Sequence, residues 1–411
     1  MTQEKLPVKE GKRILILTAD AGFGHRSAAK AISEALQEMH PQECQVEMVN
    51  PLQDKRVPLL LRKSGEDYDR LVRVMPSLYK LEYDMADSTA TSAMVNSALS
   101  VILFEVMNDL VKKYQPNAIV TPYPLYQAPL AAVFALTQRD IPLLTVVTDL
   151  APVHRLWFNR AADLCLVSMP AVRDQAIEAG LPPENVAVTG IPVRPKLVRN
   201  QAERPAVRQK LGWDPHKITL LAVGSKRVRN MPGILQAINH SALPVQLAVV
   251  TGGDEALYNQ LKEVEWHLPI HLYNFVEDMS EMMHAADCVI CKAGGLIVTE
   301  SLACGLPILL TDAIAGQETS NARYVVDGGA GEMAETPLDG LQTVYHWLAN
   351  DGEVLNLMSH NARMLGYPNS AYDAANLTWE AAQFGASIKT DRRFVDVIDR
   401  FIKRLQKERA I

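Results

Sequence analysis

The chain alternates between short apolar runs and longer segments whose apolar residues recur at helical spacing. In its first half the apolar runs lie at 13–18, 45–49, 117–121, 143–150 and 163–168. Between the first two runs, residues 26–39 carry their aliphatic side chains on one helical face. This alternation predicts strands linked by helices, a pattern typical of a parallel sheet that is covered on both faces.

The same pattern starts again after a segment rich in proline and charge. Further apolar runs follow at 217–225, 245–253, 270–275, 287–291 and 306–312. We therefore predict two Rossmann-like domains, at 1–191 and 214–370, joined by a linker at 192–213. Residues 371–411, which include an amphipathic segment, are expected to form helices that pack across the domain junction.

Length and composition agree with a two-domain globular protein. A chain of 411 residues is longer than one hydrophobic core usually fills. The formal net charge of -6 argues against broad nucleic-acid binding, which needs a basic field. The first residues do not resemble a secretory signal, no apolar run approaches the roughly 20 residues of a spanning helix, and the cysteines are scattered. We therefore expect a cytoplasmic protein without nucleic-acid partners.

The most informative stretch follows the apolar run at 287–291. There Gly294 and Gly295 open a helical pattern that carries Thr299 and Glu300. Glycines allow the backbone to approach an anion, and the first N–H groups of a helix bind one, so a pyrophosphate fits this position. Glu300 is placed to hold a ribose diol through charge-assisted hydrogen bonds. A plain turn followed by a solvated acid stays open as the alternative for each residue taken alone.

This stretch closely resembles the nucleotide-sugar site of GT-B glycosyltransferases, in particular glycosyltransferase family 28. The segments "AGFGHRSAAKAI", "VTDLAPVHRLWF" and "AGQETSNARYVVDGGAG" are similar to its monogalactosyldiacylglycerol synthase and processive diacylglycerol glucosyltransferase branch. The resemblance covers most of the chain. It implies an α/β GT-B fold, in which two Rossmann-like domains turn parallel sheets toward a central cleft, and a UDP-galactose or UDP-glucose donor.

The resemblance also implies which residues hold the donor. Phe275 and Val276 would line the uracil pocket, and Glu300 would hold the ribose. The phosphates would lie against Gly294, Gly295 and Thr299, while Gln317, Glu318 and Asn321 would bind the hexose hydroxyls. Further donor contacts are expected from Gly24, Gly224, Ser225 and Lys226.

His25 is the candidate general base, because an imidazole with an ordinary pKa of about 6.5 accepts a proton efficiently at neutral pH. Asp149 competes for that role or orients the acceptor or the histidine. His154 and Trp157 belong to the same matched motif and are expected at the acceptor entrance. No convincing metal-binding motif appears, so neither a metal nor another cofactor is expected, and the helix dipole and basic side chains would stabilise the leaving group.

Basic and apolar residues are interleaved between Leu52 and Lys80. A basic amphipathic segment of this kind can lie in an anionic membrane surface, and Arg62, Lys63, Arg70 and Arg73 are the expected contacts. An ordinary charged surface helix is the alternative, since Lys and Arg stems often cover apolar surface without a membrane.

The function expected from these residues is that of an inverting hexosyltransferase. It would move galactose or glucose from a UDP-sugar to diacylglycerol, giving a β-glycosyl lipid, as a peripheral enzyme on the inner face of the cell membrane. Three alternatives stay open: another lipid-linked acceptor of the peptidoglycan type, a UDP-sugar epimerase, and a nucleotide-sugar-binding protein that has lost catalysis.

Overall fold

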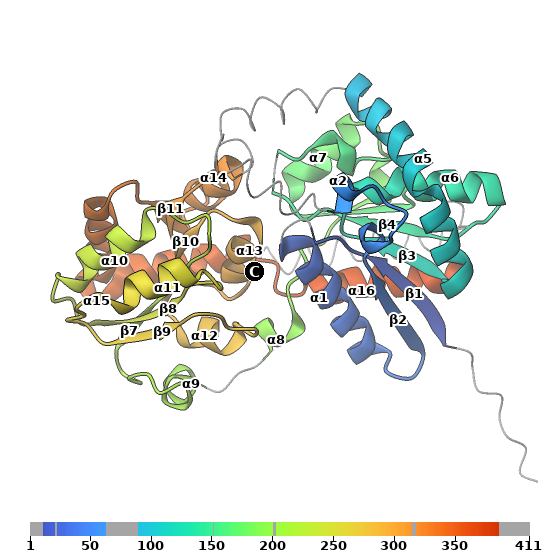
Figure 1. Cartoon of the computed structure of the whole chain (residues 1–411). Helices are drawn as coiled ribbons and strands as arrows, with labels where there is room; N and C mark the ends of the chain where they lie inside the picture. Colours follow the sequence, from blue (N-terminus) through green and yellow to red (C-terminus); the bar gives the residue numbers. More distant parts are fainter. Residues whose placement is uncertain are drawn as a thin grey trace, which may run out of the picture.

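The protein consists of two lobes, each built on its own parallel sheet (Figure 1). The structure is a computed structural model that describes residues 11–20, 23–62, 89–150, 152–199, 203–314 and 318–385. Each sheet has six strands with helices on both faces, so the predicted α/β architecture of two wound halves is confirmed.

The first sheet has the strand order β2-β1-β3-β4-β5-β6, and all of its pairs are parallel. Its strands are β1 (Lys12–Leu17), β2 (Cys44–Val49), β3 (Ala118–Thr121), β4 (Leu143–Val146), β5 (Leu164–Val167) and β6 (Val186–Val188). Strands β3, β4 and β5 are buried along their whole length. Because helices cover both faces of this sheet, its central strands carry unbroken apolar runs instead of an alternating pattern.

Helices flank the first sheet on both sides. They are α1 (Phe23–Met39), α2 (Leu59–Arg62), α5 (Thr89–Tyr114), α6 (Gln127–Thr137) and α7 (Pro170–Glu178), with the short 3-10 helices η1 (Pro51–Gln53), η2 (Pro124–Tyr126), η3 (Arg155–Trp157) and η4 (Pro183–Asn185). The aliphatic face predicted for residues 26–39 is confirmed, since Ala29, Ile32 and Leu36 of α1 pack in one core layer with β1. Helices α5 and α6 pack in the layer on the opposite face.

The second sheet repeats this plan with the order β12-β11-β10-β7-β8-β9. Its strands are β7 (Ile218–Val223), β8 (Val245–Val250), β9 (Ile270–Tyr273), β10 (Cys288–Lys292), β11 (Ile308–Asp312) and β12 (Gly331–Met333). In β10, Cys291 packs in one core layer and Cys288 in the other. Their thiols therefore face opposite sides of the sheet, as expected for residues three apart in a strand.

The remaining helices all follow β6 along the chain. They are α8 (Pro195–Val198), α9 (Arg204–Lys210), α10 (Met231–Asn239), α11 (Glu255–Lys262), α12 (Ser280–Ala285), α13 (Gly295–Ala303), α14 (Thr319–Asp327), α15 (Pro337–Leu365) and α16 (Ser370–Phe384). Helix α15 is kinked at Ala349 to Gly352, where Asn350 and Asp351 adopt left-handed backbone angles.

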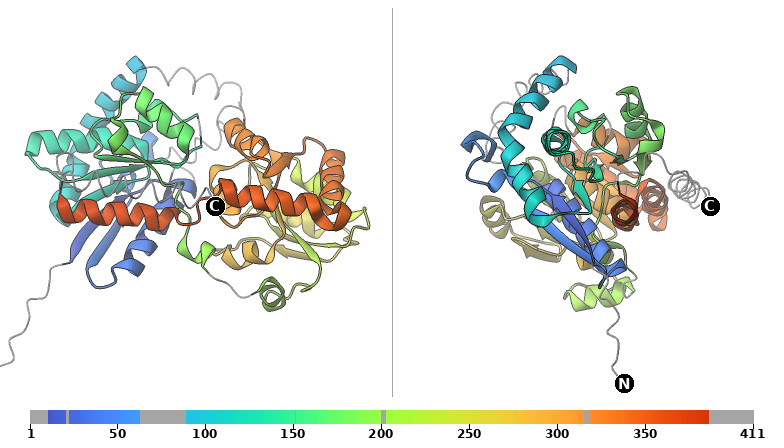
Figure 2. Two further views of the ribbon diagram at one scale, coloured as in Figure 1. Left: turned by 180° about the vertical axis from the view of Figure 1, so that it is seen from behind. Right: turned by 90° about the vertical axis from the view of Figure 1, so that its right-hand side faces the viewer.

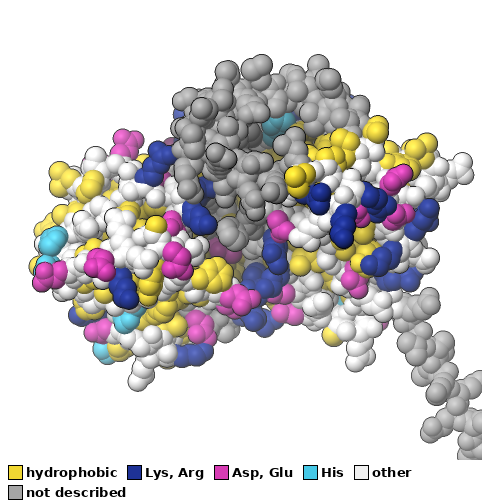
Figure 3. Space-filling view, viewed as in Figure 1, with side chains coloured by type: hydrophobic (Ala, Val, Ile, Leu, Met, Phe, Trp, Pro, Cys, Tyr) yellow, Lys and Arg dark blue, Asp and Glu magenta, His cyan; other side chains and the backbone are white. Residues whose placement is uncertain are grey.

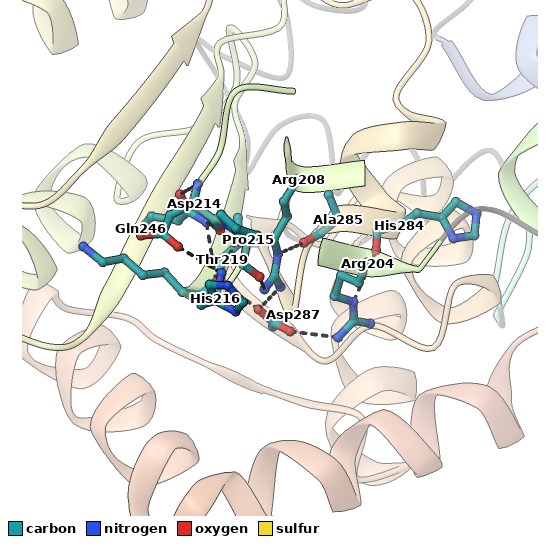
Figure 4. A network of polar contacts seen from close by, with 11 residues as sticks. Arg204, Arg208, Asp214, Pro215, His216, Thr219, Gln246, His284, Ala285 and Asp287 are labelled. Carbon is teal, nitrogen blue, oxygen red and sulfur yellow. Dashed lines mark hydrogen bonds and ion pairs between the residues drawn. The ribbon is translucent and has the colours of Figure 1, made fainter. Parts of the chain in front are cut away.

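Two segments of chain cross between the lobes. The first runs from β6 through α8 to α9, and α9 is tied to the second lobe by a buried polar network (Figure 4). In that network Asp287 accepts hydrogen bonds from Arg204 Nη1 at 2.8 Å and from the Thr219 backbone N–H at 2.7 Å. Arg208 contacts the same carboxylate and donates from Nε to the Ala285 carbonyl at 2.8 Å.

The second crossing leads from α15 to α16. Helix α16 lies across the first lobe, whereas α15 lies on the second (Figure 2). The core of the first sheet includes Ala374, Leu377 and Trp379 from α16. The domain boundaries expected from the sequence stay a prediction: 1–191, 192–213, 214–370 and 371–411. Residues 386–411 lie outside the described part of the chain.

The strand orders indicate where a ligand would bind. The first sheet reverses its direction of winding between β1 and β3, and the second between β7 and β10. In open parallel sheets ligands bind beyond the carboxyl ends of the strands at such a switch point. The loops after β1, β3, β7 and β10 are therefore the places to look for a site.

Candidate functional site

His25 lies in the first turn of α1, directly after the loop that follows β1. Its Nδ1 is 2.9 Å from Thr148 Oγ1, a hydroxyl located just beyond the end of β4. The imidazole makes an edge contact with the Tyr123 ring, at 5.1 Å between centroids, and a tilted contact with Trp157 at 6.0 Å. The ring is therefore held by residues of two connections at the carboxyl edge of the first sheet, one after β3 and one after β4.

Burial lowers the pKa of His25 below its ordinary value of about 6.5. The negative charge of Asp149 and a hydrogen bond from the protonated ring to the Pro122 backbone partly oppose this shift. A neutral imidazole is thus the dominant form at pH 7, and this is the form that accepts a proton.

Asp149 follows Thr148 in the chain, and its Oδ2 accepts the Trp157 indole N–H at 2.9 Å. Its backbone carbonyl accepts the Ser168 hydroxyl at 2.6 Å. Asp149 therefore acts on His25 through charge, while Trp157, which is 2% exposed, is fixed behind the ring.

Opposite His25, the N-terminus of α13 forms the wall that belongs to the second lobe. Gly294 caps this helix, and a Cβ added to Gly295 would lie 3.6 Å from the Thr148 carbonyl oxygen. The helix start thus lies directly against the segment that orients the histidine. The first N–H groups of α13 have no partner within the helix and carry its positive dipole end, so this gap favours an anion.

Lys292, at the end of β10, was not foreseen from the sequence. Its ammonium group pairs with the Glu318 carboxylate, and a Cβ added to Gly294 would approach that ammonium to 2.8 Å. Glu318 also accepts the Ile314 backbone N–H at 3.1 Å, and Asn321 Nδ2 donates to the Ala293 carbonyl at 2.9 Å. Glu318 and Asn321 thus lie beside the glycine pair. The signal in the sequence was a lysine that ends an otherwise apolar strand.

Thr299 and Glu300 lie on successive positions of α13 but face different surroundings. The Thr299 hydroxyl donates to the Gly295 carbonyl at 2.7 Å, inside its own helix. Burial raises the pKa of Glu300 to about 7; Arg194 opposes this shift and Asp278 adds to it. A carboxyl group desolvated in this way, on the second turn of a helix whose N-terminus favours anions, is typical of a ligand-binding position.

The loop after β7 holds Gly224, Ser225 and Lys226. A side chain at Gly224 would collide with Leu257, whose Cδ2 lies 2.8 Å from the added Cβ. The Ser225 hydroxyl accepts the Arg227 backbone N–H at 3.4 Å, and Lys226 is exposed. The loop packs too closely against α11 to admit a larger residue at its start.

Asp312, a second residue that the sequence did not indicate, anchors the far end of this loop. Its Oδ2 accepts the backbone N–H groups of Arg229 at 3.3 Å and of Asn230 at 3.2 Å. The position of Asp312 at the end of a buried strand was the available signal, because that end faces the proposed site.

Phe275 and Val276 follow β9. The Phe275 ring is 62% exposed, and its edge lies 3.9 Å from a Cβ built on Gly253, whereas Val276 packs against the core of the second lobe. An exposed aromatic ring above a glycine turn offers a stacking face for a flat ring such as a nucleobase.

Some of the remaining predicted residues have surroundings that the structure describes, and the others lie outside the described residues. Nothing lies within 4 Å of a Cβ added to Gly24, and His154 Nδ1 accepts the Leu156 backbone N–H at 3.1 Å, capping η3. Arg62 is exposed at the end of α2. Four predicted residues lie outside the described residues: Lys63, Arg70, Arg73 and Gln317.

Within the described ranges, no three His, Cys, Asp or Glu side chains gather into a possible metal site. No helix in the same ranges combines the length and apolar character needed to cross a bilayer.

Comparison with known families gives two matches that cover most of the chain. Residues 25–193 match the family model of monogalactosyldiacylglycerol (MGDG) synthase, and residues 220–375 match that of the glycosyltransferase family 28 C-terminal domain. The first match begins at His25 and contains Asp149. The second contains the glycine pair and Glu300.

Individual proteins agree with these matches. The chain is 33% identical to the chloroplastic monogalactosyldiacylglycerol synthase of Spinacia oleracea over 371 residues, covering 88% of this chain and 71% of that protein. Among solved structures, Acinetobacter baumannii MurG superposes with a TM-score of 0.55 at 19% identity, covering 90% of this chain and 99% of MurG. A putative UDP-N-acetylglucosamine 2-epimerase from Listeria monocytogenes superposes with a TM-score of 0.59 at 15% identity, covering 93% and 98%. The two structural likenesses concern the fold alone.

One expectation from the sequence is wrong. We expected a cytoplasmic enzyme on the inner face of the cell membrane, but the relatives from spinach, tobacco and Arabidopsis thaliana are all named as chloroplastic. Few, scattered cysteines do not distinguish one reducing compartment from another, so the sequence offered no basis for choosing the cytoplasm.

Proposed function

Since this chain belongs to the monogalactosyldiacylglycerol synthases of glycosyltransferase family 28, we propose that it transfers a hexose from a UDP-sugar to diacylglycerol. The product is a β-glycosyl diacylglycerol, and we propose galactose as the sugar because the relatives are named for a galactosyl product. The observation that carries the proposal is the position of His25 and Thr148 directly opposite the N-terminus of α13.

The reaction assigns a role to each side of this gap. The free hydroxyl of diacylglycerol attacks the anomeric carbon as His25 takes its proton. The bond between the anomeric carbon and the diphosphate oxygen breaks, and its electron pair leaves with UDP. Attack from the side opposite the leaving group inverts the anomeric centre, so an α-linked donor gives a β-linked lipid.

The second lobe stabilises the charge that develops on the leaving diphosphate. The N–H groups of Gly295 and its successors point toward it, and the ammonium group of Lys292 lies beside Gly294. Glu300 binds the ribose and Phe275 stacks on uracil, while Glu318, Asn321 and Gln317 hold the hexose. In this proposal no metal is required, so turnover should be unchanged by EDTA.

The test offers the protein labelled UDP-galactose, UDP-glucose or UDP-N-acetylglucosamine. Each donor is tried with diacylglycerol in mixed micelles, with a polyprenyl-linked acceptor and without an acceptor, and the lipid and nucleotide products are separated. We expect a labelled monohexosyl diacylglycerol from UDP-galactose. A labelled lipid only with a polyprenyl-linked acceptor, or conversion of UDP-N-acetylglucosamine without any acceptor, would contradict the proposal and support another transferase or an epimerase.

His25→Ala provides the test of the base. Removing the general base should lower kcat by 10²- to 10⁴-fold, the usual contribution of a positioned acid or base, and leave the Kd for UDP within about twofold. If His25→Ala keeps its activity and Asp149→Asn loses it, the base is Asp149.

We further propose that the first lobe meets the lipid surface through α2, α5 and α6. Large apolar side chains on these helices are exposed: Leu59 at 56%, Val101 at 80% and Leu136 at 74%. Apolar side chains gather along this side of the lobe in Figure 3. An acceptor buried in a bilayer requires the enzyme to approach that bilayer, and exposed apolar side chains together with Arg62, which is on the same short helix as Leu59, suit an anionic interface.

Co-sedimentation with vesicles tests this surface. Val101→Asp should reduce the bound fraction at least threefold on vesicles of phosphatidylglycerol with diacylglycerol. The matched control is Tyr345→Asp, which places the same charge at a 67% exposed position of the second lobe. Equal binding by both variants would show that α5 does not contact the membrane.

A further inference from the structure

Helix α8 occupies the crossing between the two lobes (Figure 1). Two arginines flank it in sequence, and both pair with carboxylates on α1. Arg194 makes a two-point contact with Glu34, with Nη2 2.7 Å from Oε1 and Nε 3.2 Å from Oε2. Arg199 pairs with Glu38. Glu34 and Glu38 are four residues apart on a helix and so share one face, which is the face turned toward α8.

The opposite side of α8 contacts the second lobe. The Leu197 carbonyl lies 2.6 Å from His284 Nε2 of α12, and since a carbonyl only accepts, this nitrogen carries the proton. The Cys304 thiol, next to the end of α13, donates to the same carbonyl at 3.6 Å. Lys196 is 3.8 Å from Asp278, whose carboxylate accepts the Ser280 backbone N–H at the start of α12.

These contacts join the helix that carries the proposed base to the helix that carries the proposed donor site. α1 holds His25 at one end and Glu34 further along, and α13 holds Gly295 at its start and ends beside Cys304. We infer that α8 is a strut which sets the distance between His25 and the bound donor, with Arg194 and Arg199 as positioning residues. The inference rests on the proposed transferase function, because the distance between His25 and the donor affects the rate only if His25 acts on that donor's reaction.

The Arg194 pair differs from an ordinary surface ion pair. Its two side chains are only 16% and 23% exposed, and the contact is bidentate. Exposed single-point pairs contribute little, whereas a partly buried bidentate contact restricts orientation as well as distance. Arg194 also interacts through its charge with Glu300 and Asp278. It therefore interacts with carboxylates of both lobes.

The experiment compares Glu34→Gln, Glu38→Gln and the double variant in the full-length protein. Each change removes a charge and keeps the side-chain volume. Glu43→Gln is the matched control, because Glu43 is exposed just beyond α1 and lies outside the strut. For each variant we would measure kcat, KM for the donor, Kd for UDP and the thermal midpoint.

If α8 is a strut, each single variant lowers kcat about tenfold and the double variant lowers it further, while the Kd for UDP stays within twofold. This split arises because the donor site lies within the second lobe and its distance from His25 changes. The Kd is compared at pH 8, above the pKa of Glu300 of about 7, so that a change in the charge around Arg194 does not alter the protonation of Glu300. Arg194→Lys should keep only part of the wild-type kcat, since an ammonium group cannot reproduce the two-point contact with Glu34. A normal kcat in the double variant overturns the inference, as does a parallel loss of UDP affinity and thermal midpoint.

A second measurement does not depend on turnover. Spin labels on E43C and L338C, at exposed positions of the first and second lobes, report the distribution of distances between the lobes. The strut predicts a broader distribution in the Glu34→Gln/Glu38→Gln background than in the background with both glutamates. An unchanged distribution overturns the strut, whereas a wild-type protein that transfers no hexose overturns the proposed function and leaves this readout valid.

Discussion

Two polar contacts orient the His25 ring: the Thr148 hydroxyl at Nδ1 and a hydrogen bond with the Pro122 backbone. In the tautomer that a base needs, Nδ1–H donates to Thr148 Oγ1 and Nε2 keeps its lone pair. Tyr123 and Trp157 contact the ring faces and edges without a polar bond. Without the hydroxyl the ring would keep its place but lose the preference for one tautomer.

Thr148→Val therefore changes the chemistry with little change of volume. Thr148 is 5% exposed, so no bulk water replaces the lost oxygen easily. We expect kcat to fall about tenfold, which corresponds to the roughly 1.4 kcal/mol of one buried hydrogen bond, with no change in the Kd for UDP. Thr148→Ser, which keeps the hydroxyl, should restore most of the rate; a fully active Thr148→Val would show that the hydroxyl does not orient the base.

Glu300 titrates within the physiological range. Burial raises its pKa to about 7, against the opposing charge of Arg194. A protonated carboxyl group can accept fewer hydrogen bonds from a ribose diol than a carboxylate. Because folding raises the pKa of Glu300, the folded protein without ligand binds this proton more tightly than the unfolded chain does. The resulting contribution to the free energy of unfolding is present at low pH and is lost as the pH rises through about 7.

We accordingly expect UDP to bind more tightly as the pH increases from 6 to 8. The Kd should fall by up to about tenfold per pH unit below the pKa and level off above it. Isothermal titration calorimetry at several pH values measures this, with Glu300→Gln as the control that removes the carboxyl titration. A Kd with the same pH dependence in Glu300→Gln would assign the effect to another group.

At the scale of elements, α9 shows how a linker segment becomes part of a lobe. Its two arginines converge on Asp287, which also accepts the Thr219 N–H at the start of β7 (Figure 4). Burial lowers the pKa of Arg208, and the charge of Asp287 opposes that shift. A buried guanidinium requires its partner, because an uncompensated charge in the interior is costly.

Asp287→Ala removes that partner and should lower the free energy of unfolding by about 3–5 kcal/mol. Urea denaturation of the purified protein measures the change. The control is Glu281→Gln, which breaks the exposed pair between Lys210 of α9 and Glu281 of α12. It should lower the free energy of unfolding by less than about 1 kcal/mol. Similar losses in both variants would mean that the Asp287 network is no more than a surface contact.

At the scale of the whole molecule, the chain returns to its first lobe after completing the second. α16 places Ala374, Leu377 and Trp379 in the core beneath β1 and β3, and the two views of Figure 2 show it on that lobe. The first lobe therefore gains its full core only when the last described helix has formed.

Leu377→Ala tests this dependence. Leu377 is 1% exposed, so the substitution should lower the free energy of unfolding of the first lobe by about 2–5 kcal/mol, while the second lobe still binds UDP. Leu357→Ala, at a 60% exposed site on α15, should change it by less than about 0.5 kcal/mol. Loss of UDP binding together with stability in Leu377→Ala would place α16 in a different role.

The sequence by itself determined the two wound halves and the neighbourhood of the site. Buried parallel strands need unbroken apolar runs, and such runs are visible in a short stretch of sequence. A glycine pair before a helical pattern is visible in the same way. Both features are therefore local. His25 and Glu300 lie within the two regions that match the family models, and their roles stay predictions.

Only the tertiary structure decided what each side chain touches. Thr148 lies far from His25 along the chain, as do Lys292 from Glu318 and Arg194 from Glu34, and no local pattern encodes such pairs. The partner of Asp149 likewise turned out to be the Trp157 indole. Periodicity reports which face of an element is buried, whereas the packing of elements from distant parts of the chain determines which polar groups meet on that face.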